Sequence, residues 1–115
     1  MEDFMEIEFK TAKLKKTCES YDLAKKQWGE KMARAIIKRL NEIQSADCIA
    51  DLNHAPPTRC HLLEPHKLGI YAVDVGHPFR LTFQAVSESG QPIGNIDASQ
   101  VKCVKILEVT NYHDD

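Results

Sequence analysis

Residues 76–86 have the sequence GHPFRLTFQAV, in which apolar and polar side chains alternate from Phe79 to Ala85. Successive side chains of a β-strand point to opposite faces, so this alternation predicts a half-buried strand over 79–86. The Gly-His-Pro turn before it follows Ile70–Val75, an apolar run that predicts the preceding strand. These two strands form the predicted centre of a sheet.

Three further strands are predicted along the chain. Met5–Phe9 alternates apolar and acidic residues, and Arg59–Leu63 is a short run after a loop at 47–58. Val101–Val109 follows a long loop at 87–100, which contains two glycines and a proline. Residues 110–115 are expected to form a polar tail.

Two helices are predicted between the first strand and the loop at 47–58. Thr11 can cap a short helix that ends near Tyr21, and Asp22 can cap a longer one, Leu23–Ala46. The order β-α-α-β-β-β-β predicts one α+β domain over 1–115, with two N-terminal helices packed on an antiparallel sheet. The apolar residues of the longer helix recur every three or four positions and define its buried face: Trp28, Met32, Ile36, Leu40 and Ile43.

The composition is that of a globular protein. Of the 115 residues, 43% are apolar and 28% are charged, which excludes a wholly disordered or collagen-like chain. No run approaches the length of about 20 apolar residues that a membrane helix needs, and the acidic N-terminus does not resemble a signal peptide. We therefore expect a cytoplasmic protein with no membrane partner.

The sequence contains no motif for a cofactor or a metal ion. A glycine-rich phosphate loop, a G-x-S-x-G elbow and an H-E-x-x-H motif are all missing, which argues against nucleotide hydrolases, esterases and zincins. The four cysteines include no C-x-x-C pair, so we expect four reduced, partly buried thiols. A metal site at Cys60 and His61 is the alternative.

The net charge of −2 is distributed unevenly along the chain. Residues 10–39 carry ten basic side chains against three acids, a balance of +7, and the other 85 residues carry five against fourteen, or −9. Lys31, Arg34 and Lys38 are spaced three and four apart, which places them on one face of the predicted helix. A stripe of one sign suits contacts with RNA phosphates, and the alternative is an ordinary solvated helix face.

Two further features suit chemistry on a phosphate. Arg80 lies on the polar face of its predicted strand, where its guanidinium could bind phosphate or, alternatively, pair with Asp74 on the neighbouring strand. Near the C-terminus, His113 has a side chain that titrates near neutral pH and suits acid–base catalysis, and Tyr112 could stack on a base. The alternative for this segment is a frayed tail.

Four short motifs occur in a specific order along the chain: APPTR at 55–59, GIYAV at 69–73, HPFRLTF at 77–83 and a closing YH at 112–113. Together with the predicted order of elements, they resemble the HigB branch of the RelE/ParE toxin superfamily. These are the plasmid maintenance killer proteins of bacterial type II toxin–antitoxin pairs. The resemblance extends from about Met5 to His113.

This resemblance implies a small ribosome-dependent endoribonuclease that requires no metal. Such toxins cut mRNA in the ribosomal A site, stop translation and are neutralised by a co-encoded helix-turn-helix antitoxin. Operator DNA would be contacted only through the antitoxin. In the implied reaction a ribose 2′-OH attacks the adjacent phosphate, which requires a base, an acid for the leaving oxygen and cations for the developing charge.

The resemblance also implies roles for individual residues. Arg80 would stabilise the phosphate, and Arg59 would be a second phosphate ligand. Tyr112 would stack on or orient a base, and His113 would be the general base or acid. His61, on the same face of the predicted strand as Arg59, is a weaker acid–base candidate.

The sequence departs from the family pattern at three positions. Glu64 stands where the family commonly has a lysine, Asp74 where a basic residue is usual, and Asn111 where an acid often precedes Tyr-His. Lys67 could supply the charge that is lost at Glu64. Two other hypotheses stay open: a ParE-type inhibitor of DNA gyrase, and a catalytically weakened module that binds an antitoxin.

Overall fold

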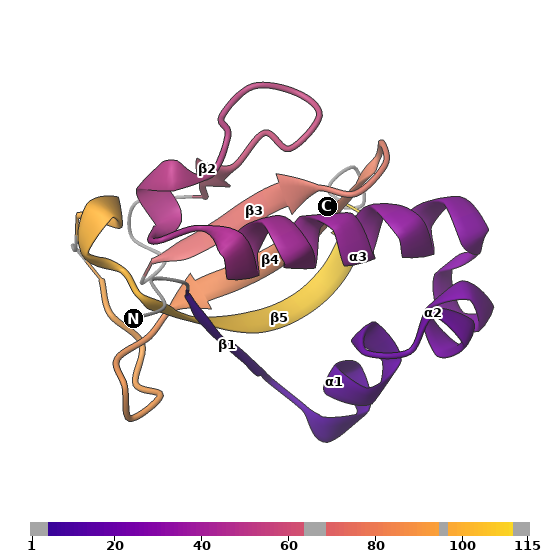
Figure 1. The fold of residues 1–115 in the computed structure, drawn as a ribbon, viewed down its shortest axis with the longest axis horizontal. Coiled ribbons are helices and arrows are strands. Elements are labelled where there is room, and N and C mark those ends of the chain that lie inside the picture. The colour runs from indigo at the N-terminus through magenta and orange to yellow at the C-terminus, as the bar shows by residue number, and fades with distance from the viewer. Residues whose placement is uncertain (1–4, 64–68, 95–96, 112–115) are drawn as a thin grey trace.

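The computed structural model describes residues 5–63, 69–94 and 97–111 (Figure 1). In these residues the chain forms an α+β fold of three α-helices and a five-stranded mixed sheet. Two short 3-10 helices, Ile49–Asp51 and Ala98–Gln100, lie in the connecting loops. The helices are α1 (Ala12–Cys18), α2 (Tyr21–Trp28) and α3 (Glu30–Ser45), and the strands are β1 (Glu6–Phe9), β2 (His61–Leu62), β3 (Ile70–Asp74), β4 (Phe79–Ala85) and β5 (Cys103–Asn111).

The strands lie in the order β1-β5-β4-β3-β2 across the sheet. The pairs from β2 to β5 are antiparallel, whereas β1 pairs parallel with β5, so the prediction of a wholly antiparallel sheet is wrong at one edge. The helices carry the chain from β1 at one edge to β2 at the other, and three reversals then return it beside β1. Alternation along the sequence predicts strands but does not identify their neighbours.

Gly29 divides the predicted helix Leu23–Ala46 into α2 and α3, so the described residues form three helices where two were predicted. Its φ of 89° and ψ of 160° lie outside the helical region, in a conformation that glycine adopts at little cost. The side chain of Ser20, rather than that of Asp22, caps α2. The predicted cap of α1 by Thr11 is confirmed, since its Oγ1 accepts a hydrogen bond from the helix at 3.0 Å.

The apolar face of α3 packs on one face of the sheet, across which the helix lies in Figure 1. Ile36, Leu40 and Ile43 are buried, as the spacing of the apolar residues predicts. No helix in the part of the chain that the structure describes is long and apolar enough to cross a membrane. The three central strands of the sheet, β3, β4 and β5, contribute these buried residues to the core: Val73, Leu81, Phe83, Ala85, Val104 and Ile106.

The ends of two strands differ from the prediction. β5 ends at Asn111 rather than at Val109, so the last two residues of the strand, which were expected in the tail, are paired with β4. A β-bulge between Thr82 and Phe83 shifts the register of β4 against β5. β2 is limited to His61–Leu62 and is shorter than the predicted strand at 59–63.

None of the four cysteines forms a disulfide, as predicted, and all four are buried rather than partly buried. Burial raises the pKa of the Cys60 thiol to about 12, and burial together with the charge of Glu19 raises that of Cys18 to about 11. Because the thiolate is the reactive form, we expect iodoacetamide to modify neither of these two thiols at an appreciable rate in the folded protein at pH 8. After unfolding in guanidinium chloride, mass spectrometry should find all four cysteines alkylated. Rapid modification of native Cys60 would contradict the burial of this thiol.

Candidate functional site

One end of the sheet brings together polar residues that are far apart in the sequence. Asp74 ends β3 and is the register partner of Arg80 on β4, which is in turn the partner of Thr110 on β5. Register partners share a face of the sheet, so these three residues form one row on the face opposite the apolar core. Arg59, which precedes β2, joins the row through Asp74.

The carboxylate of Asp74 forms an ion pair with Arg59. Its Oδ2 lies 3.5 Å from Nη1 of Arg59, whose side chain is 49% exposed, whereas that of Asp74 is 20% exposed. The sequence had raised the alternative of a salt bridge between Asp74 and Arg80. In the structure this carboxylate has Arg59 as an ion-pair partner and Arg80 as its neighbour across the strand pair. Asp74 is therefore the ion-pair partner of one arginine and the register partner of another.

The backbone of Arg59 adopts an unusual conformation. Its φ of 47° lies in the left-handed region, which is unfavourable for a residue with a side chain. Hydrogen bonds hold it there: Arg59 N donates to Ala55 O at 3.0 Å, and His61 Nδ1 lies 2.7 Å from Arg59 O. This conformation explains why β2 begins only at His61. The prediction that Arg59 and His61 share one face of a strand is therefore wrong.

The ring of His61 is held by a hydrogen bond to the main chain. A carbonyl oxygen only accepts hydrogen bonds, so the contact with Arg59 O assigns the hydrogen to Nδ1, and the neutral ring then has its lone pair on Nε2. His61 lies opposite Ala72, two residues along β3 from Asp74. Standard strand spacings put its Cα about 12 Å from that of Arg80. His61 therefore flanks the row without belonging to it.

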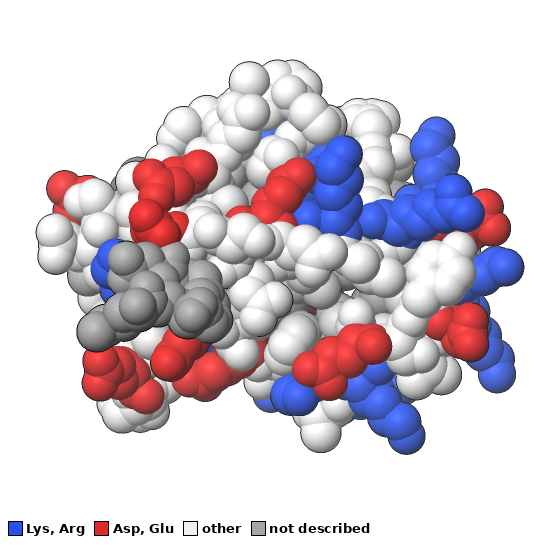
Figure 2. Space-filling view, in the orientation of Figure 1, with Lys and Arg blue, Asp and Glu red and all other residues white. Residues whose placement is uncertain are grey.

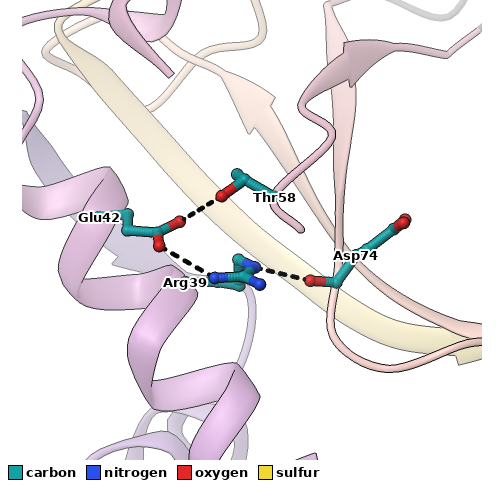
Figure 3. Close-up of polar contacts among 4 residues, drawn as sticks. All are labelled: Arg39, Glu42, Thr58 and Asp74. Carbon is teal, nitrogen blue, oxygen red and sulfur yellow. Dashed lines mark hydrogen bonds and ion pairs between the residues drawn. The ribbon is translucent and has the colours of Figure 1, made fainter. Parts of the chain in front are cut away.

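A partly buried hydrogen-bond network fastens this end of the sheet to α3 (Figure 3). Arg39 is 5% exposed and donates from Nε to the main-chain oxygen of Asp74 at 2.8 Å and from Nη1 to Glu42 at 2.9 Å. The other carboxylate oxygen of Glu42 accepts from Thr58 Oγ1 at 2.8 Å. Asp74 N also donates to Thr58 O at 2.9 Å. The network thus holds Thr58, the residue before Arg59, next to the main chain of Asp74.

The network leaves the acid side chain available. Figure 3 shows the carboxylate of Asp74 pointing away from Arg39, which binds only the main-chain oxygen of this residue. The buried arginine therefore positions Asp74 without neutralising it. This division explains how Asp74 can be anchored through its backbone and still form an ion pair with Arg59.

Comparison with known proteins gives no relative: no protein-family model, no curated protein and no solved structure matches the chain. Function is therefore inferred from the residues themselves. Among residues 5–63, 69–94 and 97–111, no group of three His, Cys, Asp or Glu side chains could hold a metal ion.

The sequence contained a signal that Arg39 is buried, although this residue is one of the ten basic residues of the segment 10–39. Arg39 lies three positions after Ile36 and directly before Leu40, so it falls on the buried face of α3. Glu42, three residues further on, is its nearest partner of opposite charge. Thr58 had no such signal, because it meets Glu42 only through the tertiary fold.

The predicted basic stripe lies on the exposed face of α3. Lys31, Arg34 and Lys38 are all exposed, and Figure 2 shows most Lys and Arg side chains on the side formed by the first helices and the first half of α3. Arg34 Nη2 lies 3.6 Å from Glu30. A hydrogen bond to Tyr21 and the charge of Glu30 raise the pKa of Arg34. Within the described segments, neither lysine of the stripe forms an ion pair.

Four residues named in the sequence analysis lie outside the described residues: Glu64, Lys67, Tyr112 and His113. The last described residue, Asn111, is the register partner of Phe79, and Phe79 is the residue before Arg80 on β4. The extra length of β5 therefore brings its end to the row of Asp74, Arg80 and Thr110.

Proposed function

We propose that this chain is a HigB-like type II toxin, a metal-independent endoribonuclease that cuts mRNA on the ribosome and is neutralised by a helix-turn-helix antitoxin. The observation that carries the proposal is that Arg59 pairs with Asp74, the register partner of Arg80, at the end of the sheet where β5 reaches Asn111. In the sequence, Tyr112 and His113 follow directly. Two arginines at the end of the sheet, in a chain whose next residues in the sequence are a tyrosine and a histidine, supply the residue types that RNA cleavage needs.

The proposed reaction needs only side chains. A base takes the proton of a ribose 2′-OH, whose oxygen attacks the adjacent phosphorus. The bond from phosphorus to the 5′-oxygen breaks, and this oxygen takes a proton from an acid, which leaves a 2′,3′-cyclic phosphate and a 5′-OH. Arg59 and Arg80 stabilise the charge on the phosphoryl oxygens, and His113 and His61 are the candidates for the two proton transfers.

The basic face of α3 has a separate role in this proposal. Lys31, Arg34 and Lys38, together with Lys67, bind phosphates of ribosomal RNA, while the end of the sheet acts on mRNA. Such contacts are independent of base sequence and weaken as salt is added. They orient the toxin without taking part in the cleavage.

Controlled expression in bacteria tests the proposal. Induction of the wild-type chain should stop growth and create new mRNA 5′ ends, and Arg80→Ala and His113→Ala should each abolish both effects. Lys102→Ala is a matched control, because Lys102 is an exposed cation that precedes β5, at the other end of that strand from Thr110. Unchanged growth and transcripts at high expression of the wild type would refute the toxin. Inhibition of gyrase without RNA cleavage would select the ParE-type alternative.

A second candidate is the catalytically weakened module that binds an antitoxin. The ion pair between Arg59 and Asp74 favours it, because a carboxylate occupies one of the two guanidinium groups that a phosphate would need. Harmless expression of the lone chain, together with tight binding to a small helix-turn-helix protein, would select this function.

The same ion pair gives a prediction for Asp74→Asn. We expect this variant to bind single-stranded RNA about three to ten times more tightly than the wild type, because it removes a charge that repels phosphate and competes for Arg59. The hydrogen bonds of Asp74 to α3 and to the loop use its main chain, so the fold should be retained. Fluorescence anisotropy with a labelled RNA oligonucleotide at two salt concentrations measures the change.

Glu88→Gln is the control for this measurement. Glu88 is an exposed acid in the loop that follows β4, at the other end of the strand from Arg80. The Glu88→Gln substitution also removes one negative charge, but at a site far from Arg59. Its effect on RNA affinity should therefore be small. Equal gains in the two variants, or weaker binding by Asp74→Asn, would show that the carboxylate of Asp74 does not compete with phosphate.

A further inference from the structure

Among the strands that the structure describes, β1 forms one edge of the sheet. It is the last strand in the order, with β5 on one side only. Glu6 N donates to Lys102 O and Lys10 N donates to Ile106 O, both at 2.9 Å, so every second residue of this segment directs its main-chain groups toward β5. The N–H and C=O groups of Ile7 and Phe9 therefore point away from the sheet, where another strand could pair with them.

A groove of about 780 Å³ lies beside this edge. It separates β1 from α1 and α3, and its lining is more apolar than polar. Its cation Lys15 already forms an ion pair with Glu19 at 2.9 Å. The apolar residues of the lining are Met5, Ile7, Phe9, Cys18, Tyr21, Ile37 and Leu40.

The two faces of β1 differ in character. Ile7 and Phe9 are half-buried and pack against the core, whereas Glu6 and Glu8 alternate with them and are exposed. Within residues 5–63, 69–94 and 97–111, neither glutamate forms an ion pair. The edge therefore offers unpaired main-chain groups, an apolar groove on one face and two carboxylates on the other.

We propose that the edge of β1 binds an extended segment of a partner protein in which apolar and basic residues alternate. Cross-strand neighbours share a face, so a strand added here places one set of side chains beside Ile7 and Phe9, over the groove, and the other set beside Glu6 and Glu8. The first set must be apolar and the second basic. The length of β1 limits the paired segment to about four to six residues.

Two alternatives fit the edge less well. Charged residues on an edge strand can simply prevent aggregation, but that role needs no apolar groove beside the strand. A second copy of this chain that paired through its own β1 would bring the glutamates of both copies together, and like charges on neighbouring strands destabilise the pair. A basic partner strand meets neither objection. This inference does not depend on the proposed cleavage of RNA.

A capped synthetic peptide of about seven residues, alternating valine and lysine, is the probe. We expect it to bind the full chain and to slow hydrogen exchange of the Ile7 and Phe9 amides about tenfold, as measured by NMR. The amides of Glu6 and Glu8 already face β5 and should not change. A peptide of alternating valine and glutamate should not bind, because its acids would lie beside those of β1.

Variants of the two glutamates complete the test. The double variant Glu6→Lys/Glu8→Lys should weaken binding of the valine–lysine peptide about tenfold or more. Glu8→Lys alone should weaken it to a smaller extent. Glu108→Lys, the same change at an exposed site on β5, should leave the affinity unchanged. Absence of binding, binding without protection of Ile7 and Phe9, or equal affinity of the double variant would each overturn the proposal. So would a dimer in sedimentation with these two amides already protected.

Discussion

Replacement of Arg80 with alanine is expected to lower the rate of RNA cleavage about a hundredfold or more. Charge builds up on the phosphoryl oxygens as the 2′-oxygen attacks, and the loss of one donor aimed at such charge typically costs about two to three orders of magnitude. Arg80 is the register partner of both Asp74 and Thr110, so neighbouring strands on both sides hold its backbone in place. An arginine guanidinium can bind phosphate through two parallel hydrogen bonds.

The measurement uses purified toxin, ribosomes and a short mRNA under single-turnover conditions. Arg80→Lys keeps the charge but loses the fork of donors, so its rate should lie between those of the wild type and Arg80→Ala. Lys102→Ala is the matched control and should cleave like the wild type. Thermal unfolding of each variant identifies any loss that arises from misfolding. Cleavage by folded Arg80→Ala at the wild-type rate would remove this residue from the catalytic site.

Local sequence patterns predicted the parts of the fold that depend on side-chain periodicity. The alternation from Phe79 to Ala85 and the spacing of apolar residues in α3 both describe faces that the structure buries. The pattern of apolar residues did not predict the helix end at Gly29. A glycine inside a helix costs only about 1 kcal/mol relative to alanine. At positive φ, however, its conformational freedom ends α2 and begins α3.

The candidate site was predicted only as separate residues. Arg59, Asp74 and Arg80 were each identified from the sequence, but their meeting depends on the register of β3 and β4 and on the left-handed conformation of Arg59. Register follows from how whole strands pack, and no local pattern specifies it. The contacts of Thr58 with Glu42 and of Arg39 with Asp74 join segments that are distant in the sequence, so they were also beyond prediction.

Replacement of Arg39 with alanine is expected to lower the free energy of unfolding by about 3 kcal/mol. The change leaves the main-chain oxygen of Asp74 and one carboxylate oxygen of Glu42 without their donor, and the removal of one partner from a partly buried ion pair is destabilising. The Arg39 side chain is 6% exposed and that of Glu42 is 32% exposed, so water can relieve only part of the loss. Urea denaturation, with the slope held common among variants, measures the change.

Arg34→Ala is the matched control, because it removes an arginine from the exposed face of the same helix. Its partner Glu30 lies 3.6 Å away at the surface, where such a pair contributes about 1 kcal/mol or less. Arg39→Lys cannot reproduce both hydrogen bonds of the guanidinium and should fall between the two. Equal destabilisation by Arg34→Ala and Arg39→Ala would show that the buried network adds nothing beyond helix formation.

A double-mutant cycle separates the network from simple packing. If Arg39 and Thr58 act through Glu42 as one unit, Arg39→Ala and Thr58→Val should together destabilise the protein less than the sum of the two, by about 1 kcal/mol. Independent packing effects would add without such a difference. Since Thr58 directly precedes Arg59 and Arg39 holds Asp74, the same coupling should appear in RNA affinity at temperatures where every variant is folded. Coupling in stability without coupling in RNA binding would limit the network to a structural role.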